Sequence, residues 1–319
     1  MENKEVLNFD TVILGGGPAG MSAAIYTGRG ELKTAIIDIS MLGGQPSNYL
    51  ELENYPGFGL IGGFELMEKF ESHADKFGVE KFSLQEITDI KLDGEIKTIE
   101  TGDYIFKAKT VILATGAKPK KLGIKGEQEF LSRGVSYCAV CDGAFYKEKI
   151  VAVIGGGNAA VEEGAYLTKF AKKVYIIHRR DSLRADKLAQ QRAFQNDKIK
   201  FIWDTVPVEI QGDNLVEKII IKNVKTNEIS ELAVDGVFPY IGFSPNVDLL
   251  NGKIEQDEQG FIKTNANLET NVEGVFAAGD VRVTPLRQVI TAASDGAVAG
   301  CSAVKFLENQ KVKVSWKNF

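Results

Sequence analysis

Two copies of one short pattern constrain the fold of this chain most: an apolar run, a glycine-rich turn and then a helical pattern. The first copy has its apolar run at residues 11–14 and its glycine turn at 15–20, followed by small and apolar residues at helical spacing. Gly15, Gly17 and Gly20 hold the first, third and sixth places of the dinucleotide-binding fingerprint, which lets the backbone approach a pyrophosphate at the helix N-terminus. The pattern predicts an α/β nucleotide-binding domain.

The second copy begins near the middle of the chain. Residues 150–154 form its apolar run, 155–160 its glycine turn, 161–170 the expected helix and 173–177 the next strand. An alanine replaces the third glycine, a common variation where the helix packs on the strand. The candidate nucleotide-binding residues of this turn are Gly155, Gly157, Asn158 and Ala160.

The two copies differ at the end of their second strand. Asp38 lies 23 places after the first glycine of the first turn, where a carboxylate accepts from a ribose hydroxyl. The residue 23 places after the first glycine of the second turn is His178, and three arginines follow it: Arg179, Arg180 and Arg184. Guanidinium groups hold a 2′-phosphate that a carboxylate would repel. We therefore expect an adenine dinucleotide with a free ribose at the first site and NADP(H) at the second; the alternative is a solvated basic loop.

The two halves resemble each other beyond their glycine turns. In each half, a stretch with period-two alternation and a turn motif precedes a closing strand. These stretches are residues 87–108 before 110–116 in the first half, and 208–232 before 236–242 in the second. An internal duplication accounts for this economically.

A third segment, residues 274–280, is another short strand ending in Gly-Asp, and a small-residue helical pattern follows it. Its natural place is back on the first domain. The sequence therefore predicts an α/β fold of two Rossmann-like three-layer nucleotide-binding domains, the second inserted into the first. The expected limits are 1–117 and 248–319 for the first domain and 118–247 for the second.

The inserted half also carries a Cys-x-x-Cys pair, Cys138 and Cys141. Two thiols so spaced close a small disulfide ring and commonly include one thiol of lowered pKa, which predicts a reversible two-electron switch. A zinc site needs two further ligands at suitable spacing, and the remaining Cys301, His73 and His178 do not supply such a pair. A metal site and inert buried thiols remain the alternatives.

Composition excludes several classes of function. The net charge of -5 and the lack of a long Lys/Arg block argue against a nucleic-acid partner. No apolar run approaches the roughly 20 residues that span a bilayer. The N-terminus lacks the basic start and apolar core of a signal peptide, so we expect a cytoplasmic protein with no membrane association. Thiols are kept reduced in that compartment, where a Cys-x-x-Cys is more often catalytic than structural.

In order and spacing, the motifs of this chain resemble the low-molecular-weight, bacterial-type thioredoxin reductases, which use FAD and NADPH. The resemblance covers nearly the whole chain. Beyond the two glycine turns and the basic cluster, it rests on Gly43-Gly44-Gln45, Asn54-Tyr55-Pro56-Gly57, Ala114-Thr115-Gly116, Cys138-Ala139-Val140-Cys141-Asp142-Gly143, and Gly279-Asp280 with Arg287-Gln288.

The resemblance implies which residues hold FAD on the first domain and NADPH on the inserted one. The implied FAD residues are Gly15, Gly17, Gly20, Asp38, Gln45, Asn54, Thr115, Gly116, Gly279, Asp280, Arg287 and Gln288. It also implies that Cys141 faces the flavin, that Cys138 exchanges with the partner disulfide, and that Asp142 manages the thiol protons. A thioredoxin-like protein would be the partner and a homodimer the assembly.

The position of Asp142 also supports a role as the acid. Residues 40–60 contain no cysteine and no histidine follows His178, so the cysteine placement and histidine base of glutathione-type reductases are missing. Asp142, next to Cys141, is then the candidate by position, and burial would have to raise its pKa for it to donate near neutral pH. The alternative is a turn residue or a helix cap.

Chain topology predicts movement between the domains. The cysteines lie in the same inserted domain as the second glycine turn, whereas FAD would lie on the other domain. If nicotinamide and disulfide use the same side of the flavin, they take turns, so we expect residues of about 118 to 247 to rotate on two connecting segments.

Two competing functions keep the same fold. One is a reductase that takes electrons from ferredoxin, against which Arg179, Arg180 and Arg184 count. The other is a redox sensor without turnover. Among single residues, we expect Cys301 to be a buried packing thiol and His73 to lie at the surface or an interface.

Overall fold

The computed structural model describes residues 4–49, 52, 54–250 and 252–317, without the side chains of residues 140, 141 and 311–317. The chain forms two compact units. The first unit comprises residues 1–118 and 244–319, and the second comprises residues 119–243. The limits expected from the sequence for the inserted domain, 118–247, begin one residue before and end four residues after those of this second unit.

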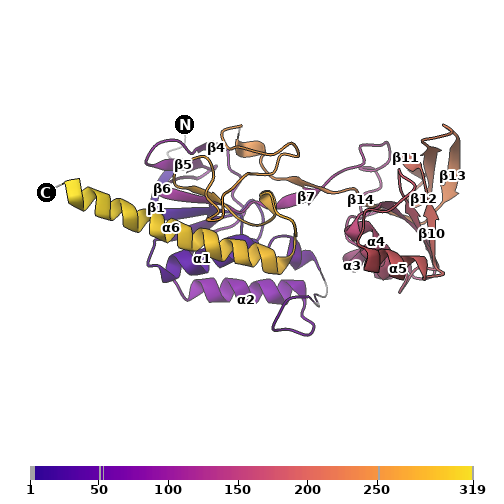
Figure 1. The fold of residues 1–319 in the computed structure, drawn as a ribbon, viewed down its shortest axis with the longest axis horizontal. Helices are drawn as coiled ribbons and strands as arrows, with labels where there is room; N and C mark the ends of the chain where they lie inside the picture. The colour runs from indigo at the N-terminus through magenta and orange to yellow at the C-terminus, as the bar shows by residue number, and fades with distance from the viewer. Residues whose placement is uncertain (1–3, 50–51, 53, 251, 318–319) are drawn as a thin grey trace. The chain divides into compact units, whose positions relative to one another are not determined.

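A mostly parallel sheet forms the centre of the first unit (Figure 1). Its strands run in the order β3-β2-β1-β6-β5-β4, and β16 also pairs with β6. The strands are β1 (Glu5–Leu14), β2 (Thr34–Ile37), β3 (Glu80–Phe82), β4 (Asp89–Lys91), β5 (Lys97–Glu100), β6 (Tyr104–Leu113) and β16 (Val275–Ala277). Because β16 pairs in parallel with β6, the prediction that segment 274–280 returns to the first domain is confirmed.

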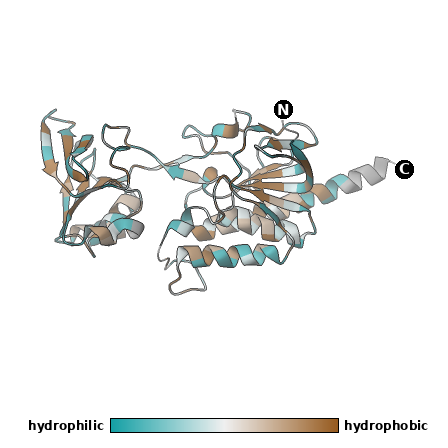
Figure 2. Cartoon of the chain, turned by 180° about the vertical axis from the view of Figure 1, so that it is seen from behind, coloured by the Kyte–Doolittle hydropathy of each residue, from teal (hydrophilic) through white to brown (hydrophobic). Residues whose placement is uncertain are grey.

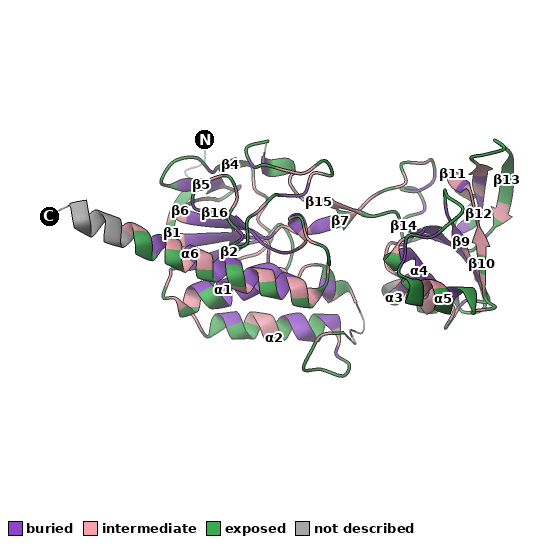
Figure 3. Cartoon of the chain, in the orientation of Figure 1, coloured by how far each residue is buried: buried purple, intermediate pink, exposed green. Residues whose placement is uncertain are grey.

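Helices cover one face of this sheet: α1 (Pro18–Arg29), α2 (Gly63–Asp75) and α6 (Val289–Lys317). The alternation of β1 explains the layers. Ile13 packs with buried residues of α1 and α6, while Val12 and Leu14 lie in a second core on the opposite face. The hydrophobic strands are drawn brown in Figure 2, and Figure 3 shows them buried.

The second unit repeats this arrangement with a smaller sheet. Its parallel strands run in the order β10-β9-β8-β14, and β11, β12 and β13 form a separate antiparallel layer. Val151 and Val153 pack toward α4, whereas Ala152 and Ile154 pack with residues of the antiparallel layer. The elements are β8 (Ile150–Gly155), α4 (Asn158–Leu167), β9 (Lys173–Ile177), α5 (Lys187–Phe194), β10 (Ile199–Ile202), β11 (Thr205–Gly212), β12 (Val216–Asn223), β13 (Ile229–Ala233) and β14 (Gly236–Tyr240).

The two connecting segments pair with each other, which the sequence did not indicate. β7 (Ala117–Pro119) and β15 (Phe243–Pro245) form a two-stranded ribbon. Cys138 directly precedes the short helix α3 (Ala139–Asp142), which contains Cys141. The 3-10 helices are η1 (Gln45–Asn48), η2 (Gly143–Tyr146), η3 (Asp248–Leu250) and η4 (Gly279–Val281). In the part of the chain that the structure describes, no helix has the length and apolar character needed to cross a membrane.

Candidate functional site

The first glycine turn joins β1 to α1 and leaves space at its middle glycine. Gly15 has a φ of 106°, and a Cβ there would overlap the carbonyl oxygen of Ala114. A Cβ on Gly20 would overlap the carbonyl oxygen of Gly15. At Gly17 the nearest atom to a Cβ would be the Cα of Gly44 at 3.8 Å, an ordinary contact. Backbone packing within the protein requires glycine at positions 15 and 20. Gly17 instead leaves open space beside the N-terminus of α1, which has no side-chain cap.

The second glycine turn, between β8 and α4, has the same division of roles. Gly155 has a φ of 152°, and a Cβ there would overlap the carbonyl oxygen of Tyr240. Gly157 has an ordinary φ of -93°, and a Cβ added there would have no other atom within 4 Å. Ala160 is fully buried on the third-glycine position. The fold itself does not need a glycine at 157. The open space beside its Cα therefore fits a cradle for a bound pyrophosphate.

Asn158 connects this turn to α5. The backbone N–H of Asp186 donates to Asn158 Oδ1 at 2.8 Å, and Asn158 Nδ2 donates to Asp186 Oδ2 at 3.1 Å. Asp186 in turn caps α5 by accepting from the N–H of Ala189 at 2.9 Å. The Asn158 side chain therefore fixes the segment that follows the basic cluster.

Asp38 follows β2 at the carboxyl edge of the first sheet, next to the glycine turn. Its Oδ2 accepts from the backbone N–H of Gly16 at 2.7 Å, and its Oδ1 accepts from the N–H and the hydroxyl of Ser40 at 2.8 Å each. The half-buried carboxylate is thus held in place and retains lone pairs for a ribose hydroxyl.

The basic cluster at the end of β9 divides into one buried and three exposed side chains. Arg179, Arg180 and Arg184 are exposed, whereas His178 is 4% exposed with its ring against Gly156. Burial, followed by the charges of the three arginines, lowers the pKa of His178. The arginines therefore carry the positive charge, while His178 packs beneath the turn. The N–H of Arg184 donates to the carbonyl of Gly156 at 2.7 Å, which holds this loop on the glycine turn.

The remaining residues implied for FAD come from loops of the first unit. Gln45 is exposed at the start of η1, and Asn54 Nδ2 donates to Gln288 Oε1 at 2.9 Å. The Thr115 hydroxyl donates to the carbonyl of Asn246 at 2.7 Å, which fixes the turn at Gly116, where φ is 68°. Hydrogen bonds thus connect Asn54 with Gln288 and Thr115 with Asn246, residues that are far apart in the sequence.

Asp280 and Arg287 lie after β16 and form the charged part of this set. Burial raises the pKa of Asp280 to about 6, against the opposing effect of Arg287. The Arg287 guanidinium lies over the ring of Phe261 at 4.0 Å from its centroid. Gly279, with a φ of 77°, donates its N–H to Asp295 at 3.1 Å and so begins the turn that places Asp280.

Three buried polar atoms without a hydrogen-bond partner lie in or next to the two candidate nucleotide sites. Among the described residues there are four such atoms, Ser47 Oγ, Glu163 Oε2, His178 Nε2 and Arg287 Nε. Ser47 follows Gln45 in η1, and His178 and Arg287 belong to the candidate sites themselves. Since buried polar groups are normally paired, orphaned atoms at these positions fit sites that bind a polar ligand.

The redox segment, residues 136–142, contains a disulfide. Cys138 is disulfide-bonded, which excludes it as a zinc thiolate ligand in this state. The side chain of Cys141 lies outside the described part of the chain, so its pairing stays a prediction. Asp142 is half-buried and its side chain makes no capping hydrogen bond at the start of η2, which does not support the helix-cap interpretation.

Sequence reasoning missed three residues that hold the redox segment. Tyr240 accepts a hydrogen bond from the N–H of Ala139 at 2.8 Å, and Tyr137 donates one to Glu127 at 2.6 Å. The tyrosine directly before Cys138 was a visible signal. Tyr240 gave none, because it lies far along the chain and meets the segment only in the folded unit.

Two single-residue expectations have clear outcomes. His73 is exposed on α2, as expected. Cys301 was expected to be buried, and that prediction is wrong: it is an exposed free thiol. The reason is the register of α6, which packs against α1 through Gly296 and Gly300, where a Cβ would meet α1 backbone. Cys301 follows Gly300 by one residue and points away from that contact.

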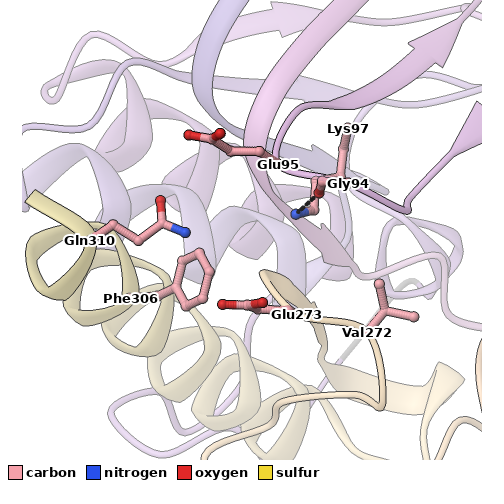
Figure 4. Close-up of a pocket in the computed structure, with 7 residues that line it drawn as sticks. All are labelled: Gly94, Glu95, Lys97, Val272, Glu273, Phe306 and Gln310. Carbon is pink, nitrogen blue, oxygen red and sulfur yellow. Dashed lines mark hydrogen bonds between the residues drawn. The ribbon is translucent and has the colours of Figure 1, made fainter. Parts of the chain in front are cut away.

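A separate pocket of about 430 Å³ lies in the first unit (Figure 4). The turn between β4 and β5, the segment before β16 and α6 line it. Its buried Lys97 donates from Nζ to the carbonyl of Gly94 at 2.8 Å, and burial lowers its pKa. None of the residues that line the pocket is a candidate nucleotide-binding residue. The lining residues are Gly94, Glu95, Lys97, Val272, Glu273, Phe306 and Gln310.

Glu163 on α4 gives a stability prediction. Burial and the neighbouring Glu162 raise its pKa to about 7, so the unfolded chain releases this proton at a lower pH than the folded one. The resulting loss of stability grows as pH rises from about 4.5 to about 7. We expect Glu163→Gln to stabilise the protein at pH 8 by up to about 3 kcal/mol and to be neutral below pH ~4.5. Thermal unfolding at both pH values checks this, with exposed Glu308→Gln as the control; equal gains at both pH values would contradict it.

The comparisons with known proteins agree with this geometry. The family model described as pyridine nucleotide-disulphide oxidoreductase matches residues 9–297. The chain is 48% identical over 307 residues to a thioredoxin reductase of Peptoclostridium acidaminophilum, covering 94% of this chain and 97% of the relative. It is 48% identical over 302 residues to a thioredoxin reductase of Bacillus subtilis, covering 94% and 95%.

A solved structure gives the same result. The crystal structure of Lactococcus lactis thioredoxin reductase superposes with a TM-score of 0.87 at 48% identity, covering 94% of this chain and 99% of that one. The fold prediction of two Rossmann-like domains is thereby confirmed. Thioredoxin reductases of this family use FAD and NADPH. The chain belongs to the pyridine nucleotide-disulphide oxidoreductases and, within them, to the low-molecular-weight, bacterial-type thioredoxin reductases.

Proposed function

We propose that this protein passes electrons from NADPH, through FAD and a Cys138–Cys141 disulfide, to a thioredoxin or thioredoxin-like protein. One observation carries the proposal: a disulfide-bonded cysteine lies in the same unit as a glycine turn flanked by three exposed arginines. With Cys301 a free thiol, Cys141 is the cysteine left in the chain to pair with Cys138.

FAD would bind on the first unit. Its pyrophosphate would lie in the space at Gly17, between the tight Gly15 and Gly20, with the adenosine ribose at Asp38. The half-buried Asp280 and the orphaned Nε of Arg287 would supply polar contacts farther along the cofactor, and the hydrogen-bonded pair Asn54 and Gln288 would supply others. Bound there, FAD would relay two electrons from a nicotinamide to the disulfide.

NADPH would bind on the second unit, with its pyrophosphate at Gly157. Arg179, Arg180 and Arg184 would hold the 2′-phosphate, because guanidinium groups form bidentate, charge-assisted hydrogen bonds to phosphate. His178, buried and uncharged beneath the turn, would position this loop rather than neutralise the phosphate.

The space at Gly157 gives a prediction that separates binding from folding. Gly157→Ala should leave the melting temperature unchanged, because its Cβ meets no protein atom within 4 Å. It should lower kcat/KM for NADPH by roughly tenfold or more, because the methyl group fills the cradle. Gly155→Ala is the matched control and should lower stability itself, since its φ is 152° and its Cβ overlaps Tyr240. Unchanged NADPH kinetics in Gly157→Ala would contradict the assignment.

Within the disulfide, Cys138 would exchange with the partner and Cys141 would meet the flavin. Asp142 would hold and return the proton that thiol–disulfide exchange requires. Its half-buried side chain, free of a capping role in η2, supports this assignment.

The two redox steps would require the second unit to turn relative to the first. The paired connecting segments β7 and β15 are the natural hinge, because two short strands are the sole covalent links between the units. Cross-linking the two units should allow one flavin reduction and abolish turnover. The un-cross-linked fraction of the same preparation is the control, and full turnover in the linked fraction would exclude rotation.

Steady NADPH oxidation in the presence of oxidised bacterial thioredoxin tests the proposed function. Continued oxidation until the thioredoxin is consumed is the expected result. A single burst of oxidation would instead favour a redox sensor. The ferredoxin-dependent alternative is not favoured, because the three exposed arginines have no role in it. A homodimer is part of the proposal, and sedimentation equilibrium tests it.

A further inference from the structure

A buried carboxylate, Glu127, lies at the centre of a hydrogen-bonded cluster that ends at the residue before Cys138. Glu127 is 1% exposed. Its Oε1 accepts from the N–H of Leu122 at 2.7 Å and from the hydroxyl of Tyr137 at 2.6 Å, and its Oε2 accepts from the N–H of Gly123 at 2.8 Å. Three donors therefore stabilise a charge that would be costly to bury unpaired.

The next two residues of the chain are also held. The N–H of Cys138 donates to the hydroxyl of Ser136 at 3.0 Å, and the N–H of Ala139 donates to the Tyr240 hydroxyl at 2.8 Å. Three consecutive residues, beginning at Tyr137, thus donate hydrogen bonds to three different acceptors. The bond from Tyr137 is the one made to a charged group, and such bonds are roughly twice as strong as neutral ones.

These bonds matter most when the disulfide is open. The S–S bond itself constrains the cysteines in the oxidised state. After reduction, the backbone contacts keep the two thiols at bonding separation, and their effective concentration sets how readily the disulfide re-forms. Loosening the residue before Cys138 lowers that concentration and shifts the equilibrium toward the dithiol.

We propose that Glu127, acting through Tyr137, is a positioning residue that sets the dithiol–disulfide equilibrium of Cys138 and Cys141. This rests on the proposed function, because it takes that pair as the redox couple. Glu127 also accepts from Leu122 and Gly123, the residues that follow the connecting strand β7. It therefore ties the start of the second unit to the redox segment.

Two variants probe the contact with different structural cost. Glu127→Gln places an amide NH2 against a backbone N–H, whereas Tyr137→Phe removes one hydroxyl and preserves the ring. Exposed Glu129→Gln, two residues along, makes the same chemical change as the first variant outside the cluster. The FAD-loaded full chain is equilibrated in glutathione buffers, and the dithiol fraction is read by alkylation of Cys138 and mass spectrometry. Both cluster variants should shift the equilibrium constant about tenfold toward the dithiol, which is about 30 mV, and Glu129→Gln should not.

Kinetics separate positioning from general damage. NADPH-driven reduction of ferricyanide does not need the disulfide and should be unchanged in all three variants. Turnover with dithiobisnitrobenzoate should fall about tenfold in the two cluster variants, and combining them should add little, because they break one contact. An equilibrium constant within twofold of wild type in Tyr137→Phe would overturn the proposal. If the wild type fails to reduce ferricyanide, the proposed function is wrong, and the glutathione equilibrium still decides the role of Glu127.

Discussion

Replacing Cys138 by serine should abolish thioredoxin reduction while leaving flavin reduction by NADPH intact. A serine cannot form the mixed disulfide with the partner, and loss of a nucleophile lowers turnover by roughly three orders of magnitude or more. The step from NADPH to flavin involves none of the atoms of Cys138. Stopped-flow flavin absorbance and thioredoxin-dependent NADPH oxidation measure the two activities separately.

Cys301→Ser is the matched control for this variant. It removes the free, exposed thiol of α6 by the same substitution and should leave both activities unchanged. Residual thioredoxin reduction above a few per cent in Cys138→Ser would show that another thiol carries the exchange. Loss of activity in Cys301→Ser would point to that residue.

The second large effect is expected at the basic cluster. Arg180→Ala combined with Arg184→Ala should lower kcat/KM for NADPH by about 10²- to 10⁴-fold, because each of the two lost charge-assisted contacts costs about 1.5–3 kcal/mol. NADH lacks the 2′-phosphate, so its kcat/KM should change by less than about threefold. Initial rates with each nucleotide give the ratio.

A nearby arginine provides the control for charge alone. Arg192→Ala removes a positive charge from the exposed side of α5, outside the basic cluster. It should leave the preference for NADPH unchanged at physiological salt, since exposed charges are screened beyond about 8 Å. An equal loss with both nucleotides in the double variant would indicate a damaged fold instead of a lost phosphate contact.

Local chain geometry made much of the fold predictable. Strand β9 has the limits that its apolar run predicts, 173–177. The glycine turns could be recognised in the sequence because closely spaced glycines between an apolar run and a helical pattern are typical of a tight strand-to-helix turn. Helix α4 begins at Asn158, three residues before the prediction, because the end of the glycine turn already forms the first helical turn.

Features that depend on distant residues were not predictable. The pairing of β7 with β15 and the bond from Ala139 to Tyr240 join segments far apart in the chain. His178 was grouped with the arginines by its place in the sequence, and only the packing of its ring on Gly156 separates it from them. Cys301 shows the same limit, since small neighbours suggested burial but the helix register turns it outward.

Anaerobic addition of NADPH, and separately of NADH, to the purified protein tests the central claim most directly. The visible flavin absorbance should bleach promptly with NADPH and respond little to NADH, as expected if the three arginines select the 2′-phosphate. A yellow protein that remains unchanged with both nucleotides would contradict the account, because the second glycine turn would then not deliver electrons to the flavin.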